Sequence, residues 1–294
     1  MTNDEANIQE VLSDLKNSKK ATTIIVGNQK GGVSKTINSC LIAYTLAKRG
    51  VKTLLADIDQ QASATKILLK TKKQANPDAD NDINKTVMDG IKEGSFDNLA
   101  MSITDNLDLL PSYKDLKDFS NDVYTKVRDS YGTNEADHIF AKLLEPLKKD
   151  YDVIILDTPP YDSSMNDNGL LASDYILISF QTQQGGFDGA DDYTDTIAEL
   201  HDNYGIDNKI LGMIPSLYNK RNWVDKTMLK QAKEYFGEKY VFKNIVDTMP
   251  RIERYPVLGI SNNDIFERRV LSKYSDITDE MLLRMYKIEK DGVL

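Results

Sequence analysis

Seven short apolar or alternating runs constrain the fold of this chain most strongly. They are "TTIIVG" (22–27), "KTLLAD" (52–57), "NLDLLP" (106–111), "YDVIILD" (151–157), "DYILISF" (174–180), "KILGMIP" (209–215) and "KYVFKNIV" (239–246). Each has the length of a strand, and most are separated by stretches long enough for a helix. Because strands that alternate with helices form crossover units, the sequence predicts an α/β fold with a doubly wound, mostly parallel sheet flanked by helices.

Two further segments complete the predicted domain organisation. Residues 4–18 place Ile8, Val11, Leu12 and Leu15 at the spacing of one helix face, which predicts an amphipathic helix. The polar stretch 70–85 is predicted to form a surface loop. We therefore divide the chain into an N-terminal helical extension, 1–20, and one domain, 21–294.

The composition leaves little room for disulfide or metal-cluster chemistry. A chain of 294 residues can bury the core of one large α/β domain. Its single cysteine, Cys40, excludes a disulfide framework and a multi-cysteine metal site within one chain. The two histidines, His138 and His201, are far apart and lack the spacing of metal ligands. No signal peptide opens the sequence and no 18-residue apolar run crosses it, so a cytoplasmic protein is expected.

Charge is distributed unevenly along the chain. The formal net charge is −9, but residues 209–294 hold 16 Lys+Arg against 12 Asp+Glu, a balance of +4. Residues 1–208 therefore carry −9 − 4 = −13. A basic-leaning end on an acidic body indicates either a surface that faces a polyanion or ordinary solvated helix faces.

The segment "GNQKGGVSKT" (27–36) lies between the first predicted strand and a predicted helix. Backbone N–H groups of such a loop can surround phosphate oxygens, and the helix N-terminus adds its positive dipole. Lys35 is expected to neutralise the β- and γ-phosphates, and the Thr36 hydroxyl is expected to bind Mg²⁺. Ser34 replaces a usual glycine, which indicates a position that needs no glycine-only conformation. A second lysine, Lys30, stands five residues before Lys35.

Carboxylates follow two other predicted strands. Asp57 and Asp59 end the run in "LLADIDQQASAT" (54–65), and Asp157 ends the run in "YDVIILDTPP" (151–160). Ligands of such sheets bind at the carboxyl ends of the strands. Carboxylates there can hold Mg²⁺ or orient a nucleophilic water, which phosphoryl transfer requires.

Together these motifs resemble those of the ParA/MinD family of deviant Walker A ATPases. The signature KGGxxK[ST] is matched by Lys30, Gly31, Gly32, Lys35 and Thr36; DxDxQ by Asp57, Asp59 and Gln61; and DxPP by Asp157, Pro159 and Pro160. The resemblance covers roughly residues 20–275 and is closer to the ParA proteins of DNA segregation than to MinD.

The resemblance implies a Mg²⁺-dependent ATPase of weak intrinsic activity whose site is completed by dimerisation. In the family the early lysine, here Lys30, reaches the phosphates of the other subunit's ATP, so ATP joins two monomers and hydrolysis loosens them. The implied nucleotide-binding residues are Lys30, Gly31, Gly32, Val33, Ser34, Lys35, Thr36 and Ile37, with Pro250 and Arg251 of a partly matched adenine-side motif. The implied catalytic residues are Lys30, Lys35, Asp59 and Asp157, and the implied metal ligands are Thr36, Asp59 and Asp157.

The leading functional hypothesis is a DNA-partitioning ATPase of the cytoplasm, associated with the nucleoid. Its ATP-bound homodimer would bind double-stranded DNA without sequence preference, and a ParB-like, centromere-binding partner would trigger hydrolysis and release. The basic residues expected to face DNA are Lys220, Arg221, Lys243, Arg251, Arg254, Arg268, Arg269 and Lys273. Phosphate contacts of this kind would weaken steeply with salt.

A membrane-cycling ATPase of the MinD kind is the alternative, and it requires a C-terminal amphipathic anchor. The candidate "ITDEMLLRMYKIEKDGVL" (277–294) has scattered apolar residues and charges of both signs, which favours a helix that packs on the core. No membrane association is therefore expected. Reductases related to the nitrogenase iron protein need paired cysteines, and bacterial tyrosine kinases need a C-terminal tyrosine cluster; the sequence has Cys40 alone and, near its end, Tyr286 alone.

Overall fold

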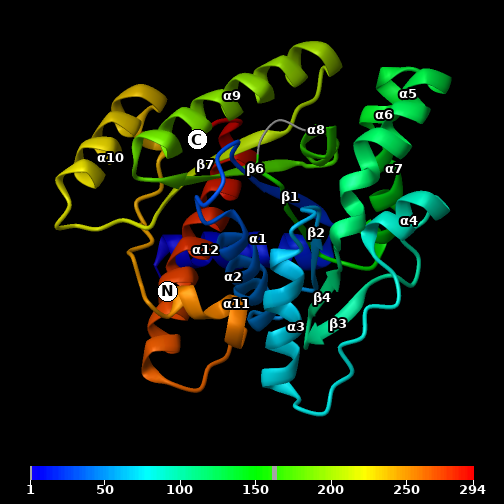
Figure 1. Ribbon diagram of the computed structural model, residues 1–294. Coiled ribbons are helices and arrows are strands. Elements are labelled where there is room, and N and C mark those ends of the chain that lie inside the picture. The colour runs from blue at the N-terminus through cyan, green and yellow to red at the C-terminus, as the bar shows by residue number, and fades with distance from the viewer. Residues whose placement is uncertain (1, 161–163) are drawn as a thin grey trace.

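The computed structural model describes residues 2–160 and 164–294 and contains a central seven-stranded sheet (Figure 1). The strands are β1 (Thr22–Gly27), β2 (Thr53–Asp57), β3 (Met101–Thr104), β4 (Leu107–Leu110), β5 (Val153–Asp157), β6 (Tyr175–Gln181) and β7 (Lys209–Ser216). Their order in the sheet is β3-β4-β2-β5-β1-β6-β7. β3 at one edge pairs antiparallel with β4, and the other pairings are parallel. The predicted fold class is thus confirmed.

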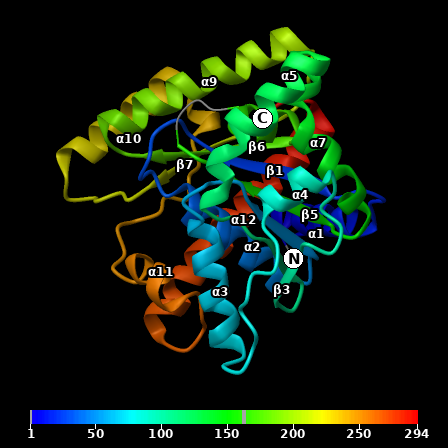
Figure 2. The same ribbon diagram turned by 45° about the vertical axis from the view of Figure 1, so that its right-hand side comes forward.

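Helices cover both faces of the sheet (Figures 1 and 2). They are α1 (Asn3–Asn17), α2 (Lys35–Lys48), α3 (Ser63–Ala75), α4 (Val87–Glu93), α5 (Thr125–Tyr131), α6 (Thr133–Asp137), α7 (Ile139–Leu144), α8 (Ser164–Leu171), α9 (Gln184–Tyr204), α10 (Trp223–Phe236), α11 (Tyr255–Leu258) and α12 (Ile265–Asp291). One core contains residues of α1, α2, α3, α11 and α12, and the other contains residues of α4, α7, α8, α9 and α10.

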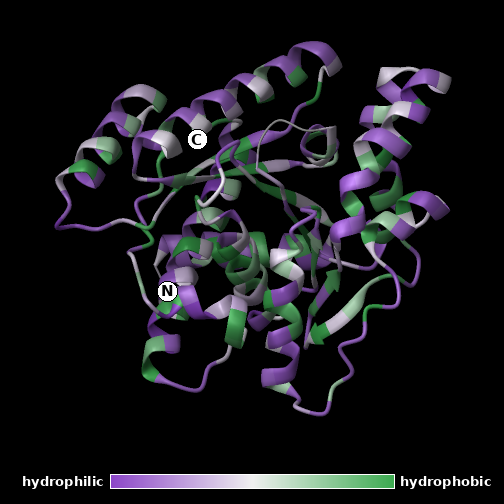
Figure 3. Cartoon of the chain, in the orientation of Figure 1, coloured by the Kyte–Doolittle hydropathy of each residue, from purple (hydrophilic) through white to green (hydrophobic). Residues whose placement is uncertain are grey.

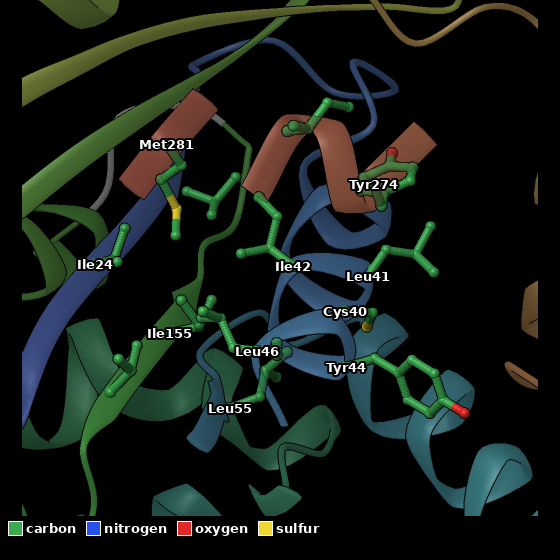
Figure 4. Packing of buried hydrophobic residues seen from close by; sticks show 14 of the residues in the cluster. Ile24, Cys40, Leu41, Ile42, Tyr44, Leu46, Leu55, Ile155, Tyr274 and Met281 are labelled. Atoms are coloured by element: carbon green, nitrogen blue, oxygen red, sulfur yellow. The ribbon is translucent and has the colours of Figure 1, made fainter. Parts of the chain in front are cut away.

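The strands serve both cores because successive side chains of a strand point to opposite faces. In β5, Ile155 lies in the first core, whereas Ile154 and Leu156 lie in the second. Figure 4 shows Ile24 of β1 and Ile155 facing the apolar side of α2. Figure 3 shows that the inner strands are largely apolar and that α9 carries polar residues on its outer turns. A strand that is buried on both faces reads as a continuous apolar run, which is why these strands were visible in the sequence.

The N-terminal helix α1 packs against the C-terminal helix α12. Thr2 and Glu5 form a capping box at its start. The four apolar residues predicted to share one face (Ile8, Val11, Leu12 and Leu15) are the residues that the helix buries, and they lie in the same core as α2 and α12. An ion pair of 2.8 Å between Glu10 and Lys290 joins the two helices at the surface.

The prediction of a strand at 239–246 was wrong. The segment makes one isolated bridge to β7, Met213 to Val241, and begins with a short 3₁₀ turn, Glu238–Tyr240. The guanidinium of Arg284 donates hydrogen bonds to the carbonyl oxygens of Lys239 and Val241 in this segment and of Leu211 in β7. A buried side chain of α12 therefore occupies acceptors that a strand ladder needs, and the segment crosses the sheet edge as irregular chain.

Two other boundaries also differ from the sequence prediction. The helix α3 continues to Ala75, so the predicted loop at 70–85 begins only after that residue. The edge strand β3 was not predicted at all. Its four residues, Met101–Thr104, are only partly buried, so the run lacks the apolar pattern that marked the central strands.

Candidate nucleotide site

The loop between β1 and α2 borders a cavity of about 440 Å³ at the carboxyl ends of the strands. Gly31, Gly32 and Ser34 of the loop line the cavity, together with Lys35, Thr36 and Ile37 of the first turn of α2. The opposite walls come from the loops after other strands, from α3, and from α11 with the turn before it: Asp59, Gln61, Ser63, Ile67, Thr158, Pro160, Leu217, Ile252, Glu253 and Pro256. The three sequence motifs therefore meet around one space.

Ser34 takes a left-handed backbone conformation, with φ 71° and ψ 20°. The expectation that this position needs no glycine-like conformation is thus corrected. A side chain in this region costs roughly 1–2 kcal/mol relative to a right-handed conformation. The surrounding contacts must hold the turn in place, and α2 begins immediately after it, at Lys35.

Lys35 brings a buried cation to the cavity. Lys35 is only 6% exposed, and its Nζ donates a hydrogen bond of 2.9 Å to the carbonyl oxygen of Lys30. Burial lowers the pKa of Lys35, while the carboxylates of Asp157 and Asp59 oppose that shift. An incoming phosphate would supply the negative charge that this partly desolvated ammonium lacks.

Asp57 and Asp157 face each other in register on the neighbouring strands β2 and β5. Both are fully buried, and burial raises the pKa of each carboxyl, with their mutual repulsion adding to the shift for Asp157. Asp57 accepts hydrogen bonds from the backbone N–H and the hydroxyl of Thr65, both at 2.8 Å, and from the N–H of Asp59 at 3.2 Å. Its carboxylate therefore holds the loop and the start of α3 together.

Asp59 points into the cavity from the same loop. One carboxylate oxygen accepts the N–H of Gln61 at 2.9 Å. Burial raises the pKa of Asp59, and the ammonium groups of Lys35 and Lys66 oppose the shift. Asp59 thus presents an acceptor group to the cavity, whereas Asp57 is committed to the fold.

The donor atoms around Asp157 suit Mg²⁺. One carboxylate oxygen accepts the hydroxyl of Ser39 at 2.8 Å, and the other is buried with no hydrogen-bond partner in the described part of the chain. Thr36, whose hydroxyl helps to lower the pKa of Asp157, and Asp59 add further oxygen donors. Within residues 2–160 and 164–294 no three His, Cys, Asp or Glu side chains gather as a metal site. The protein would therefore supply a few oxygen ligands, with phosphate and water completing the shell, as Mg²⁺ commonly requires.

Lys30 differs from Lys35 in where its side chain lies. It is exposed and lies along the start of α9, where a methyl group added to Gly185 would come within 3.3 Å of its Cε. Lys30 is not among the described residues that line the cavity. The neighbouring Gln29 fastens the loop to α9 by a 2.8 Å hydrogen bond to the hydroxyl of Thr196. The second lysine is thus directed past its own cavity.

The start of α11 and the turn before it reach the cavity with residues that the sequence did not single out. Ile252, Glu253 and Pro256 line the cavity, whereas Pro250 and Arg251 are not among its described lining residues. The guanidinium of Arg251 is paired with Asp264 and Glu267, so its charge is satisfied within the fold. The partly matched motif "IVDTMPRIE" (245–253) thus reaches the cavity through Ile252 and Glu253, and adenine contacts by Pro250 and Arg251 stay a prediction.

Most of the basic residues expected to contact DNA are exposed. Lys220 and Arg221 precede α10, Lys243 follows it, and Arg254, Arg268, Arg269 and Lys273 lie on or beside α11 and α12, with Lys273 half-buried. These elements run down one side of the molecule in both views (Figures 1 and 2). Arg251 is the exception, because its two carboxylate partners neutralise it.

The family model described as "AAA domain" matches residues 21–211. Two curated relatives show the breadth of the match. The sporulation initiation inhibitor protein Soj of Bacillus subtilis is 27% identical over 238 residues, which is 80% of this chain and 88% of that protein. The chromosome partitioning protein ParA of Myxococcus xanthus is 28% identical over 80% of this chain and 78% of its own length.

Solved structures share the fold. A putative plasmid partition protein from Borrelia burgdorferi, bound to AMPPNP, superposes with a TM-score of 0.69 at 24% identity, covering 92% of this chain and 99% of that one. Cobyrinic acid a,c-diamide synthase from Mycobacterium smegmatis, with bound ADP and magnesium, superposes with a TM-score of 0.69 at 22% identity, covering 92% and 96%. At these identities the likeness shows the fold alone, and the chemistry has to follow from the residues of the site.

Proposed function

Because the chain belongs to the AAA domain family, as a ParA-type ATPase, we propose that it is a DNA-segregation ATPase that cycles between a monomer and an ATP-bound dimer. The match confirms the resemblance that the sequence motifs indicated. The proposed cycle has three parts: Mg²⁺-dependent ATP binding with weak intrinsic hydrolysis, non-specific binding of double-stranded DNA by the dimer, and release on hydrolysis stimulated by a ParB-like adaptor. Its location would be the cytoplasm, on the nucleoid.

The observation that carries this proposal is that Lys35, Thr36 and Asp59 line one cavity, with the buried carboxyl of Asp157 close enough to interact with all three. Lys35 would bind the phosphates, while backbone N–H groups of the loop and the start of α2 would surround their oxygens. Thr36 and Asp157, with Asp59 beside them, would hold Mg²⁺, which supplies charge stabilisation for phosphoryl transfer. Asp59 would orient the attacking water from the opposite wall of the cavity.

The position of Lys30 supports a shared site. Its side chain is exposed beside α9 instead of turning into its own cavity. A second copy that approached face to face would receive this cation at its phosphates, and would return its own Lys30 in exchange. Two such contacts, made only when ATP is present, would couple nucleotide state to dimerisation.

The exposed basic residues beside α10, α11 and α12, which form the basic side of the molecule, support DNA binding by the dimer. A chain of net charge −9 repels DNA overall, so one monomer's exposed arginines and lysines would bind it weakly. A dimer doubles the number of phosphates that are neutralised, which raises affinity and salt dependence together.

The membrane-cycling alternative has less support. The apolar residues of the candidate anchor, such as Met281, Leu282 and Met285, are buried in the core against α1 and α2. Among the described residues no helix is long and apolar enough to cross a membrane. A helix whose apolar side is already covered cannot lay that side on a lipid surface without leaving the fold.

The cycle is tested by light scattering and gel shift on the same preparation, with no nucleotide, with ADP, with ATP and Mg²⁺, and with ATP and EDTA. We expect a dimer and a shift of random duplex DNA only with ATP and Mg²⁺. Sedimentation with anionic vesicles under the same four conditions tests the alternative. A nucleotide-independent monomer that binds vesicles and no DNA would contradict the proposal.

A further inference from the structure

A chain of buried hydrogen bonds, the relay, runs from α12 to the phosphate loop, which is the loop between β1 and α2. The hydroxyl of Tyr274 donates to Oδ1 of Asn38 at 2.7 Å, and Nδ2 of Asn38 donates to Oγ of Ser179 at 2.7 Å. The hydroxyl of Ser179 in turn donates to the carbonyl oxygen of Val33 at 2.5 Å. All four residues are at most 1% exposed, and Figure 4 shows Tyr274 packed against α2 beside Leu41.

The last of these bonds fixes a peptide group of the loop. In a trans peptide the C=O and the following N–H point in opposite directions. Because the Val33 carbonyl is drawn toward Ser179, the N–H of Ser34 is turned the other way, and Ser34 lines the cavity. Ser34 is also the residue held in the left-handed conformation, which needs support from its surroundings.

Residue 179 secures the other end of the loop as well. Its carbonyl oxygen accepts Nδ2 of Asn28 at 2.8 Å, and Oδ1 of Asn28 accepts the backbone N–H of Lys30 at 2.6 Å. Ser179 on β6 therefore holds the phosphate loop at two places, at Lys30 through Asn28 and at Val33 directly. Since these groups are buried, a bond that is lost cannot be replaced by water without opening the core.

We propose that Ser179, Asn38 and Tyr274 are positioning residues for nucleotide binding, and that they tie the phosphate loop to α12. The inference rests on the proposed function, because it requires that the loop binds phosphate. Arg268 and Arg269 lie on the exposed side of the same helix as Tyr274, less than two turns earlier. If a ligand bound at α12 changes the affinity of the loop for nucleotide, then nucleotide changes the affinity of α12 for that ligand by the same factor, because coupling between two binding sites is reciprocal.

The relay predicts a specific pattern of affinities. Tyr274→Phe and Ser179→Ala should each weaken binding of a fluorescent ATP analogue by about two- to tenfold, the range for loss of one neutral hydrogen bond. The double variant should bind no more weakly than the weaker single variant, because both changes break one chain. Ser179→Thr keeps the hydroxyl and should retain more affinity than Ser179→Ala.

Thr278→Val is the matched control. Thr278 is buried on α12, one turn beyond Tyr274, and its hydroxyl donates to the Tyr274 carbonyl within the helix at 2.7 Å. This variant should leave the ATP affinity within about twofold of wild type, and its effect should add to that of Ser179→Ala. Melting temperatures without nucleotide show that each variant is folded at the assay temperature.

The outcomes separate the relay from the proposed function. If wild-type protein binds ATP and the Tyr274 and Ser179 variants bind it equally well, the relay is overturned and the function stands. Fully additive losses in the double variant would also overturn the relay, since independent packing defects behave in that way. A wild-type protein that binds no ATP would refute the proposed function, and this inference with it.

Discussion

Lys35 Nζ lies 2.9 Å from the carbonyl oxygen of Lys30, so the two lysines of the loop meet through the backbone of one and the side chain of the other. Their side chains then part. Lys35 is buried in the cavity, whereas the Lys30 ammonium is exposed beside α9. One loop therefore presents one cation to its own ligand and a second cation to its surroundings, and substitution of each should have a separate effect.

Lys35→Ala should abolish most of the nucleotide affinity. Lys35 supplies the charge nearest to the phosphates, and loss of charge-assisted hydrogen bonds costs about 10- to 150-fold in affinity. Isothermal titration with ADP and with ATP measures the change. The variant should still fold. Burial lowers the pKa of Lys35, so the folded protein is not stabilised by holding this charge, and its removal should cost little stability. An affinity equal to that of wild type would remove Lys35 from the binding machinery.

Lys30→Ala should instead bind ATP almost normally and fail to dimerise. Its ammonium does not line the cavity, so the ATP dissociation constant should stay within about twofold of wild type. Light scattering with ATP and Mg²⁺ should then show a monomer. Lys52→Ala, an exposed lysine just before β2 at the amino edge of the sheet, serves as control and should dimerise. Normal dimerisation of Lys30→Ala would overturn the shared-site hypothesis.

The sequence predicted the parts of this protein in which local pattern and topology agree. The central strands were visible because burial on both faces makes them continuous apolar runs. The proximity of Lys35 to Asp157 followed from a parallel sheet, since the carboxyl ends of its strands share one edge.

Contacts between distant segments could not be predicted from the sequence. Asn38, Ser179 and Tyr274 are more than 90 residues apart from one another, and none belongs to the three motifs that match the family signatures. Arg284 likewise had no sequence signal, although its guanidinium is buried and donates to carbonyl groups of β7 and of the irregular segment 239–246. Such side chains matter through the partners that the fold brings to them, and a single sequence does not state those partners.

Asp59→Asn should separate turnover from binding. The amide can still accept the Gln61 N–H, but it loses the charge that orients water, so hydrolysis should fall by about 100-fold while the ATP dimer persists on DNA. Phosphate release and light scattering on the same sample measure the two effects. The melting temperature should be unchanged or slightly higher, because burial already disfavours the charged carboxyl. Wild-type turnover would make Asp59 a loop residue without a catalytic role.

Asp57→Ala is expected to act on stability. It removes the acceptor of three hydrogen bonds, two from Thr65 and one from Asp59, and so should lower the free energy of unfolding by about 1–3 kcal/mol. Denaturant unfolding without nucleotide measures this. The pair of aspartates thus offers an internal comparison, with one residue held by the fold and its neighbour facing the cavity. Equal losses of stability in both variants would contradict this division.

Arg268→Glu combined with Arg269→Glu should abolish ATP-dependent DNA binding and leave dimerisation intact. Both side chains are exposed at the start of α12, outside the nucleotide cavity. The change moves the net charge from −9 to −13, because each reversal subtracts two charges. The slope of log affinity against log salt should become shallower by about 0.9 for each phosphate contact that is lost. Gel shifts of random duplex DNA over a series of salt concentrations measure both quantities.

A control for net charge distinguishes a local patch from general repulsion. Lys148→Glu with Lys149→Glu makes the same change, from −9 to −13, in the 3₁₀ turn Glu145–Lys149 before β5. If DNA is bound by the basic side near α12, this control should weaken binding only slightly, and mainly at low salt, where long-range repulsion is least screened. Equal loss in both double variants would assign the effect to net charge and remove Arg268 and Arg269 from the binding surface.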